Sequence, residues 1–320
     1  MLKTMSDDHP LAILHQDYVK CVELTDVFVS VIQCKKQTAS VVKALCEDFP
    51  LENLQHLKRV RSCISKDGSL QVVVCQGKTQ EEFDAVLSDV KYSCLGKPFL
   101  TKVPKLKPLT RKQFEECKLY WPVTFHENKR ITKLINLSYF SKDEIHKIQS
   151  HMKELFNQNE KSKTENAALI VDPKVNTVLA VSCDRRHLEH PLQHAVMLCI
   201  DKVARLQGGG MWDIKEECCI LENKSIKQLE EANNEKPEMC PMQSAEQYLC
   251  TGYDLYATTE PCVMCAMALV HSRIGRVFYV FPYEDGGLGS KFQIHTERDL
   301  NHNFEVFKCA LPEKKNDIRK

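Results

Sequence analysis

Two short segments of the chain each place metal-binding side chains at the start of a predicted helix. In the segment 258–270, TTEPCVMCAMALV, a proline typical of a first helical turn precedes Cys262 and Cys265. In the segment 190–198, HPLQHAVML, a second proline opens a predicted helix, and His194 lies in its first turns. Exposed N–H groups and the helix dipole favour the thiolate form that binds a metal. One histidine and two cysteines can hold one zinc ion with a fourth position left over.

Around these segments, strands alternate with helices. The apolar pattern predicts strands at AALIVD, TVLAVSC, YDLYATT and RVFYVF, with predicted amphipathic helices between them. Alternating helices and strands indicate a sheet covered by helices, so we predict an α/β/α domain over residues 141–320. The polar stretch 208–247 interrupts the pattern, and we interpret it as an insertion.

The first hundred residues follow a different order. Apolar and β-branched segments predict strand, helix, strand, strand, helix, strand, with a turn at 66–68 and the second helix over 79–93. This order is typical of a split βαβ, or ferredoxin-like, α+β arrangement. We therefore predict a smaller α+β domain over residues 1–100 and a linker over 101–140.

The predicted linker is rich in proline and in basic residues. Between residues 97 and 133 there are ten Lys or Arg and three Glu, a local balance of +7 in a chain whose formal net charge is +1. Clustered cations of this kind are typical of surfaces that bind phosphate groups. A solvated basic face without a ligand is the plain alternative.

The chain contains sixteen cysteines, which in a secreted protein would indicate disulfides. Its first residues, MLKTMSDDHPLAILHQD, lack an apolar core long enough for a signal peptide, and no stretch approaches the length of a membrane span. We therefore expect reduced thiols, a cytoplasmic and nuclear protein, and no membrane partner.

The two metal-binding segments resemble those of the cytidine and tRNA-adenosine deaminases. The signature of that family is His-x-Glu followed by Pro-Cys-x-x-Cys, and residues 256–279, YATTEPCVMCAMALVHSRIGRVFY, are especially similar to the tRNA-adenosine branch. The resemblance covers about residues 141–310. It implies a cytidine deaminase-like fold and a zinc ion held by His194, Cys262 and Cys265. An inert buried Cys-x-x-Cys beside an unrelated histidine is the alternative.

Position 196 departs from the family pattern. The family carries a proton-transferring glutamate two residues after the histidine, whereas this chain has Val196. General acid–base help is worth about 10²–10⁴-fold, and valine cannot supply it. Neither nearby acid is expected to substitute, because Glu260 has a counterpart in active relatives and Glu189 precedes the helix. We therefore predict no catalytic residue and a structural zinc ion.

Valine at this position is typical of one branch, the non-catalytic subunits of the eukaryotic heterodimeric tRNA adenosine deaminases. That resemblance implies a catalytic partner subunit that carries the glutamate, tRNA as a ligand, and a complex that converts the wobble adenosine to inosine. The alternative is an autonomous zinc-dependent deaminase of a nucleoside or RNA that uses an unrecognised base.

A tRNA ligand requires a basic surface beyond the base pocket, because phosphates supply most of the affinity. We predict that the N-terminal domain and the linker provide it. The candidate tRNA-binding residues are Lys58, Arg59, Arg61, Lys102, Lys105, Lys107, Arg111 and Lys112.

Overall fold

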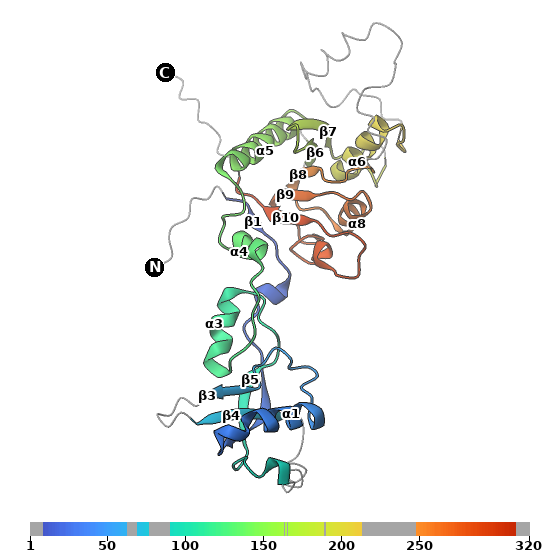
Figure 1. Cartoon of the computed structure of the whole chain (residues 1–320). Coiled ribbons are helices and arrows are strands. Elements are labelled where there is room, and N and C mark those ends of the chain that lie inside the picture. Colours follow the sequence, from blue (N-terminus) through green and yellow to red (C-terminus); the bar gives the residue numbers. More distant parts are fainter. Residues whose placement is uncertain are drawn as a thin grey trace, which may run out of the picture. The chain divides into compact units, whose positions relative to one another are not determined.

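The computed structural model describes residues 9–62, 69–76, 90–162, 164, 166–188, 190–212 and 248–311. The chain divides into two compact units, Gln16–Lys133 and Met1–His15 together with Leu134–Lys320 (Figure 1). The turn predicted at 66–68, most of the helix predicted over 79–93 and most of the predicted insertion lie outside the described residues.

The N-terminal unit is built on a four-stranded sheet. Its strands are β2 (Leu24–Ile32), β3 (Val60–Ser62), β4 (Leu70–Cys75) and β5 (Phe99–Pro104), in the order β3-β4-β2-β5. Each neighbouring pair is antiparallel. If the four strands are numbered by their order in the sequence, their spatial order in the sheet is 2-3-1-4. This is the strand order expected of a ferredoxin-like sheet.

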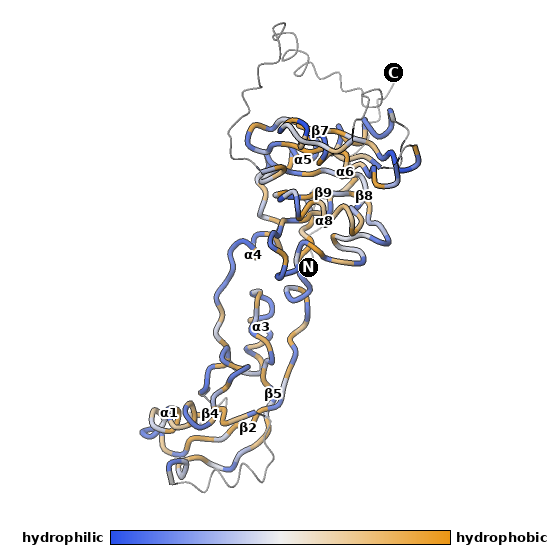
Figure 2. Tube along the Cα trace, turned by 90° about the vertical axis from the view of Figure 1, so that its right-hand side faces the viewer, coloured by the Kyte–Doolittle hydropathy of each residue, from blue (hydrophilic) through white to orange (hydrophobic). Residues whose placement is uncertain are grey.

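Both faces of this sheet are buried. Helix α1 (Thr38–Asp48) directs Val41 and Leu45 onto one face, where they pack with apolar side chains of β2 and β4. On the other face, Trp121 is fully buried beside Val29. Strands β2 and β4 are therefore apolar along most of their length (Figure 2).

Residues beyond position 100 belong to this unit, so the structure draws the boundaries differently from the predicted domain over 1–100 and linker over 101–140. Strand β5 crosses position 100, and helix α3 (Arg111–Tyr120) supplies Cys117 to the core. Thr110 and Gln113 cap this helix reciprocally, which fixes its first turn. Helix α3 has only one buried residue. Its sequence therefore resembles that of a solvated segment, which explains why it falls in the predicted linker.

The C-terminal unit contains a six-stranded sheet in the order β1-β10-β9-β8-β6-β7. The strands are β1 (Leu11–Ala12), β6 (Ala167–Asp172), β7 (Thr177–Cys183), β8 (Asp254–Thr259), β9 (Arg276–Phe281) and β10 (Glu305–Lys308). Strands β8, β9 and β10 run parallel, and the other neighbouring pairs are antiparallel.

Helices cover both faces of this sheet, which confirms the predicted α/β/α architecture. Alternate residues of β8 show the two sides: Leu255 and Ala257 join the core formed with α6 (Ala195–Leu206) and α8 (Val263–His271). Tyr256 points the other way, toward His151 of α5, at a ring-centroid distance of 5.3 Å. The bounds of the remaining helices are α4, Lys129–Ile135, and α5, Lys142–Ser162, with short 3-10 turns at Gln16–Tyr18, Lys35–Gln37, Val90–Tyr92 and Ile294–Thr296.

Strand β1 comes from residues that precede the N-terminal unit in the sequence. It pairs with β10, and the N–H of Ile13 donates to the carbonyl of Val306 at 2.9 Å. The carbonyl of Ile13 accepts a hydrogen bond from Nε2 of the buried His295, also at 2.9 Å. Residues Leu11–Ala12 therefore complete the edge of the C-terminal sheet. None of the described helices is both long and apolar enough to cross a membrane.

Candidate metal centre

The structure brings the three predicted metal ligands together at the starts of two helices. His194 is the N-cap of α6, Cys262 is the N-cap of α8, and Cys265 lies in the first turn of α8. Their ligand atoms all lie within 4.8 Å of one another. Nδ1 of His194 is 3.6 Å from Sγ of Cys262 and 3.5 Å from Sγ of Cys265.

This spacing fits a tetrahedral zinc site. Zinc binds sulfur at about 2.3 Å and histidine nitrogen at about 2.0–2.1 Å, so a tetrahedral angle separates the two ligand atoms by about 3.6 Å. Both observed N···S distances are close to that value. The donor set and its geometry therefore suit zinc without rearrangement of the backbone.

The electrostatics of the metal-free cysteines favour one thiolate. A hydrogen bond from the thiol of Cys265 lowers the pKa of Cys262 to about 5, with further help from backbone N–H groups of the first turn of α8 and from His194. Donation of this hydrogen bond, together with burial, raises the pKa of Cys265. The pair thus holds one proton, which a bound metal would displace.

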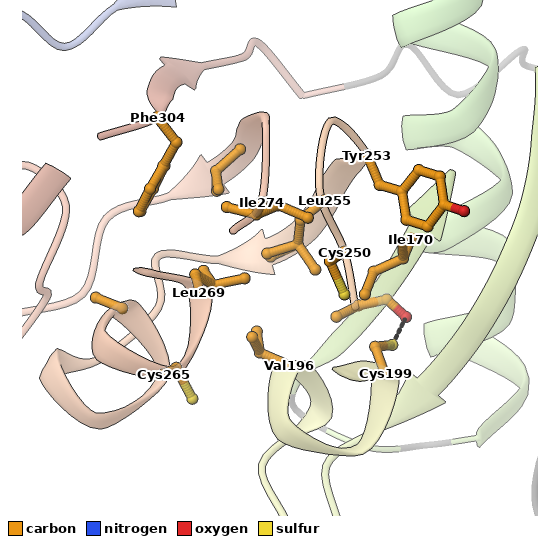
Figure 3. Close-up of a cluster of buried hydrophobic side chains, with 14 of the residues drawn as sticks. Ile170, Val196, Cys199, Cys250, Tyr253, Leu255, Cys265, Leu269, Ile274 and Phe304 are labelled. Carbon is orange, nitrogen blue, oxygen red and sulfur yellow. Dashed lines mark hydrogen bonds between the residues drawn. The ribbon is translucent and has the colours of Figure 1, made fainter. Parts of the chain in front are cut away.

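The position of the family's glutamate is filled by an apolar side chain. Val196 is 5% exposed and belongs to the same buried cluster as Cys265 and Leu269 (Figure 3). The side chain offers no atom that takes or gives a proton at this place in the first turn of α6.

Glu260 lies beside the metal ligands, but its carboxylate is hydrogen-bonded to other parts of the chain. Its carboxylate accepts hydrogen bonds from the N–H groups of Leu288 at 2.9 Å, Ser290 at 3.0 Å and Tyr283 at 3.3 Å, and from the hydroxyl of Ser290. The carboxylate is therefore occupied by the loop that follows β9, although Glu260 also lines the cavity at the metal ligands. Glu189, the other acid considered above, lies outside the described residues.

A cavity of about 80 Å³ opens at the three ligands. Its lining includes Val196 and Tyr283, and also two charged residues that the motif analysis did not single out, Asp184 and Arg186. These two follow β7 in the loop that leads to His194. The only sequence signal for them is their position a few residues before a predicted ligand.

The predicted tRNA-binding residues fall into distinct groups in the N-terminal unit. Arg59 is half-buried, and its guanidinium donates to the carbonyls of Leu45, Phe49 and Val74 at 2.8–2.9 Å and of Val73 at 3.0 Å. Arg61 donates to the carbonyl of Tyr120 and stacks over Trp121 at 4.1 Å. Both arginines are partly buried and donate hydrogen bonds within the fold, so we centre the proposed RNA surface on the other six candidates.

The other six candidates are exposed. Lys102, Lys105 and Arg111 form exposed ion pairs of 3.1–3.6 Å with neighbouring acids. The three remaining lysines, which are Lys58, Lys107 and Lys112, make no ion pair within the described ranges. Exposed pairs contribute about 0–1 kcal/mol, so a phosphate group can compete for all six cations.

Comparison with known proteins finds relatives over nearly the whole chain. The family model of the "tRNA-specific adenosine deaminase TAD3 N-terminal domain" matches residues 25–121, and that of the "cytidine and deoxycytidylate deaminase zinc-binding region" matches residues 142–281. The chain is 39% identical to the "probable inactive tRNA-specific adenosine deaminase-like protein 3" of Danio rerio, over 94% of this chain and 91% of that protein.

Two further relatives are similarly complete. The protein of the same description in Homo sapiens is 38% identical over 95% of this chain and 90% of its own length. The "tRNA-specific adenosine deaminase TAD3" of Arabidopsis thaliana is 28% identical over 93% of both chains.

Proposed function

Because the chain belongs to the family of the inactive tRNA-specific adenosine deaminase-like protein 3, we propose that it is the non-catalytic subunit of a tRNA adenosine deaminase. In this role it binds a catalytic subunit and tRNA, and the assembled complex converts the wobble adenosine to inosine. The observation that carries the proposal is Val196 beside an intact set of metal ligands. The names of the relatives, which call several of them inactive, support this function over an autonomous deaminase.

The proposed metal is one structural zinc ion bound by His194, Cys262 and Cys265. Bound zinc acidifies water in catalytic sites, whereas in structural sites it cross-links segments of the chain. The donors come from the starts of two different helices, α6 and α8, so cross-linking holds these helices together. Val196 can take no proton, which removes the chemistry that a deaminase requires at this place.

The proposed tRNA surface is the set of six exposed cations in the N-terminal unit. Five of them lie on β5, on α3 and in the segment between these elements, Lys58 lies just before β3, and none is buried. Lysine and arginine on such a surface read phosphates rather than bases, so tRNA is recognised there by its shape and charge.

The test is co-expression of the chain with a catalytic tRNA adenosine deaminase subunit that carries the glutamate. Zinc content and inosine formation in tRNA are measured for the complex and for each subunit alone. We expect one zinc ion per copy of this chain and inosine formation only when the glutamate-bearing subunit is present. Inosine formed by the purified chain alone would show that it is an autonomous deaminase.

A matched variant separates the zinc proposal from the partner proposal. Cys265→Ser removes one ligand at almost unchanged volume, and we expect it to lose zinc and to unfold at lower temperature. Cys21→Ser, at an exposed cysteine that precedes β2, is the control and should keep both properties. Equal zinc content in the two variants would contradict the ligand assignment.

A further inference from the structure

Asp184 and Arg186, in the loop between β7 and α6, form an ion pair that lines the cavity at the candidate metal centre. The N–H of Asp184, just after β7, donates to the carbonyl of Asn166 at 2.8 Å, which fixes the start of this loop. Nε of Arg186 lies 2.8 Å from both carboxylate oxygens of Asp184, and the N–H of Arg186 donates to the same carboxylate at 3.0 Å. The Asp184 side chain is 9% exposed and that of Arg186 is 28% exposed.

Both members of this pair line the cavity that contains the metal ligands. The hydrogen bond with Asp184 raises the pKa of Arg186, and the nearby Cys262 and Tyr283 add to that effect, so the guanidinium lies within electrostatic reach of the metal-binding thiol. Among the residues that the structure describes, Asp184 is the one ion-pair partner of Arg186. The pair is therefore part of the wall that a base would meet.

A flipped base needs two things from such a cavity: room, and hydrogen-bonding groups that are available to its edge. The space here, about 80 Å³, is small beside the roughly 300–1,000 Å³ of typical ligand pockets. The carboxylates in its wall are also occupied, Asp184 by Arg186 and Glu260 by the loop after β9. A base that entered would have to separate a partly buried ion pair, which leaves a charge without its partner.

We propose that the Asp184–Arg186 pair excludes a nucleobase from this pocket, as a second feature of inactivity that is independent of Val196. The inference rests on the proposed non-catalytic function and assigns part of it to named residues. Arg186 lines the cavity at the metal ligands, and the ion pair with Asp184 holds its guanidinium in that wall. A chain of this kind keeps its metal centre as a structural element and leaves base recognition to its partner.

The alternative is that the pair only stabilises the loop between β7 and α6. The two possibilities differ in one measurable property, which is the entry of a ring-shaped ligand. Loss of a purely stabilising pair lowers the melting temperature and admits nothing, whereas loss of an excluding pair opens the cavity to a purine. Binding of purine must therefore be measured together with stability.

The experiment uses the full chain and purine as the probe, with binding followed by saturation-transfer NMR. The variants are Arg186→Ala, which removes the guanidinium, and Asp184→Asn, which keeps the shape of the side chain but releases the arginine. Lys174→Ala is the matched control, because it removes an exposed cation from the turn between β6 and β7. Zinc content is measured separately on every sample.

We expect purine to bind Arg186→Ala at least about tenfold more tightly than the wild type, with Asp184→Asn between them and Lys174→Ala like the wild type. Equal purine affinity in the wild type and in both pocket variants would overturn the proposal. So would a variant that loses stability without gaining affinity. Purine binding and zinc content are measured independently. A chain without zinc would contradict the proposed structural zinc ion, and the purine measurement would still test whether the Asp184–Arg186 pair excludes a base.

Discussion

Single buried side chains shape the walls of the metal centre. Glu260 accepts hydrogen bonds from one loop, and the loop approaches so closely that a Cβ on Gly286 would lie 2.2 Å from the Glu260 carboxyl carbon. A side chain at position 286 would therefore displace the Glu260 carboxylate from these hydrogen bonds. The acid and the glycine form one structural unit that places Tyr283 at the cavity.

We expect Glu260→Gln to loosen this loop. Hydrogen bonds to a charged acceptor contribute about 1.5–3 kcal/mol each, and the amide can accept only part of them. Hydrogen exchange at the N–H groups of Leu288 and Ser290 should accelerate by about tenfold or more, as measured by mass spectrometry of peptides from 283–290. Glu284→Gln, an exposed acid in the same loop, should leave exchange unchanged, and equal protection in both variants would show that Glu260 does not hold the loop.

Arg59 gives a second prediction, which separates a structural cation from an RNA-binding one. Lysine cannot reproduce the four carbonyl contacts of this guanidinium, so Arg59→Lys should destabilise the N-terminal unit by about 2–3 kcal/mol. Urea unfolding is followed by fluorescence in a Trp212→Phe background, which leaves Trp121 as the reporter because the chain has two tryptophans.

Lys58→Ala is the control for Arg59→Lys, because Lys58 is the adjacent exposed cation. Its unfolding free energy should stay within about 0.5 kcal/mol of the wild type. A stable Arg59→Lys variant with weakened tRNA binding would return Arg59 to the RNA surface.

These residues show what the sequence could and could not predict. His194, Cys262 and Cys265 were predictable because metal-binding side chains recur at a fixed spacing at helix starts, and the resemblance to the deaminase family marked position 196. Arg59 and Arg186 carry no such pattern. Their partners are backbone carbonyls and a nearby acid, which become visible only when the chain is folded.

At the level of helices and strands, long segments with a periodic apolar pattern were predictable, whereas a short strand at the edge of a sheet was not. Strands β6, β7, β8 and β9 and helices α5, α6 and α8 follow their apolar patterns. Strand β1 has only two residues, and nothing periodic marks it. It exists because the backbone of β10 offers an edge and because His295 binds the next residue.

His295 makes the attachment of this first strand sensitive to pH. Burial lowers its pKa from the usual 6.5, so the unfolded chain binds the proton more readily than the folded chain. Stability is therefore complete above about pH 6.5 and declines as the pH falls below it, by at most about 1.4 kcal/mol per pH unit. His295→Gln keeps an N–H donor for Ile13 and cannot titrate.

Unfolding free energies at pH 7.5, 6.5 and 5.5 test this expectation. The wild type should lose stability between pH 6.5 and 5.5, and His295→Gln should lose less. A residual slope is expected from His56, whose pKa burial also lowers. Parallel pH profiles for the two proteins would mean that His295 is protonated equally in both states.

At the scale of the whole molecule, the proposed tRNA surface and the candidate metal centre belong to different units. Each has its own core: one packs on the sheet β3-β4-β2-β5, the other between the larger sheet and helices α6 and α8. The exposed candidate cations lie in the first unit and the metal ligands in the second. The proposed tRNA surface and the proposed metal site can therefore be tested by separate substitutions.

This separation predicts the effect of removing cations on the salt dependence of tRNA binding. Each lost phosphate contact reduces the slope of log K against log salt by about 0.7–0.9. The triple substitution of Lys58, Lys107 and Lys112 by alanine should therefore reduce the slope for the full chain by about 2–3, as measured by filter binding, and leave zinc content unchanged. The control removes the same charge from exposed positions of the other unit, which are Lys147, Lys153 and Lys174. An unchanged slope in the first triple variant, or an equal loss in the second, would show that these cations do not form the tRNA surface.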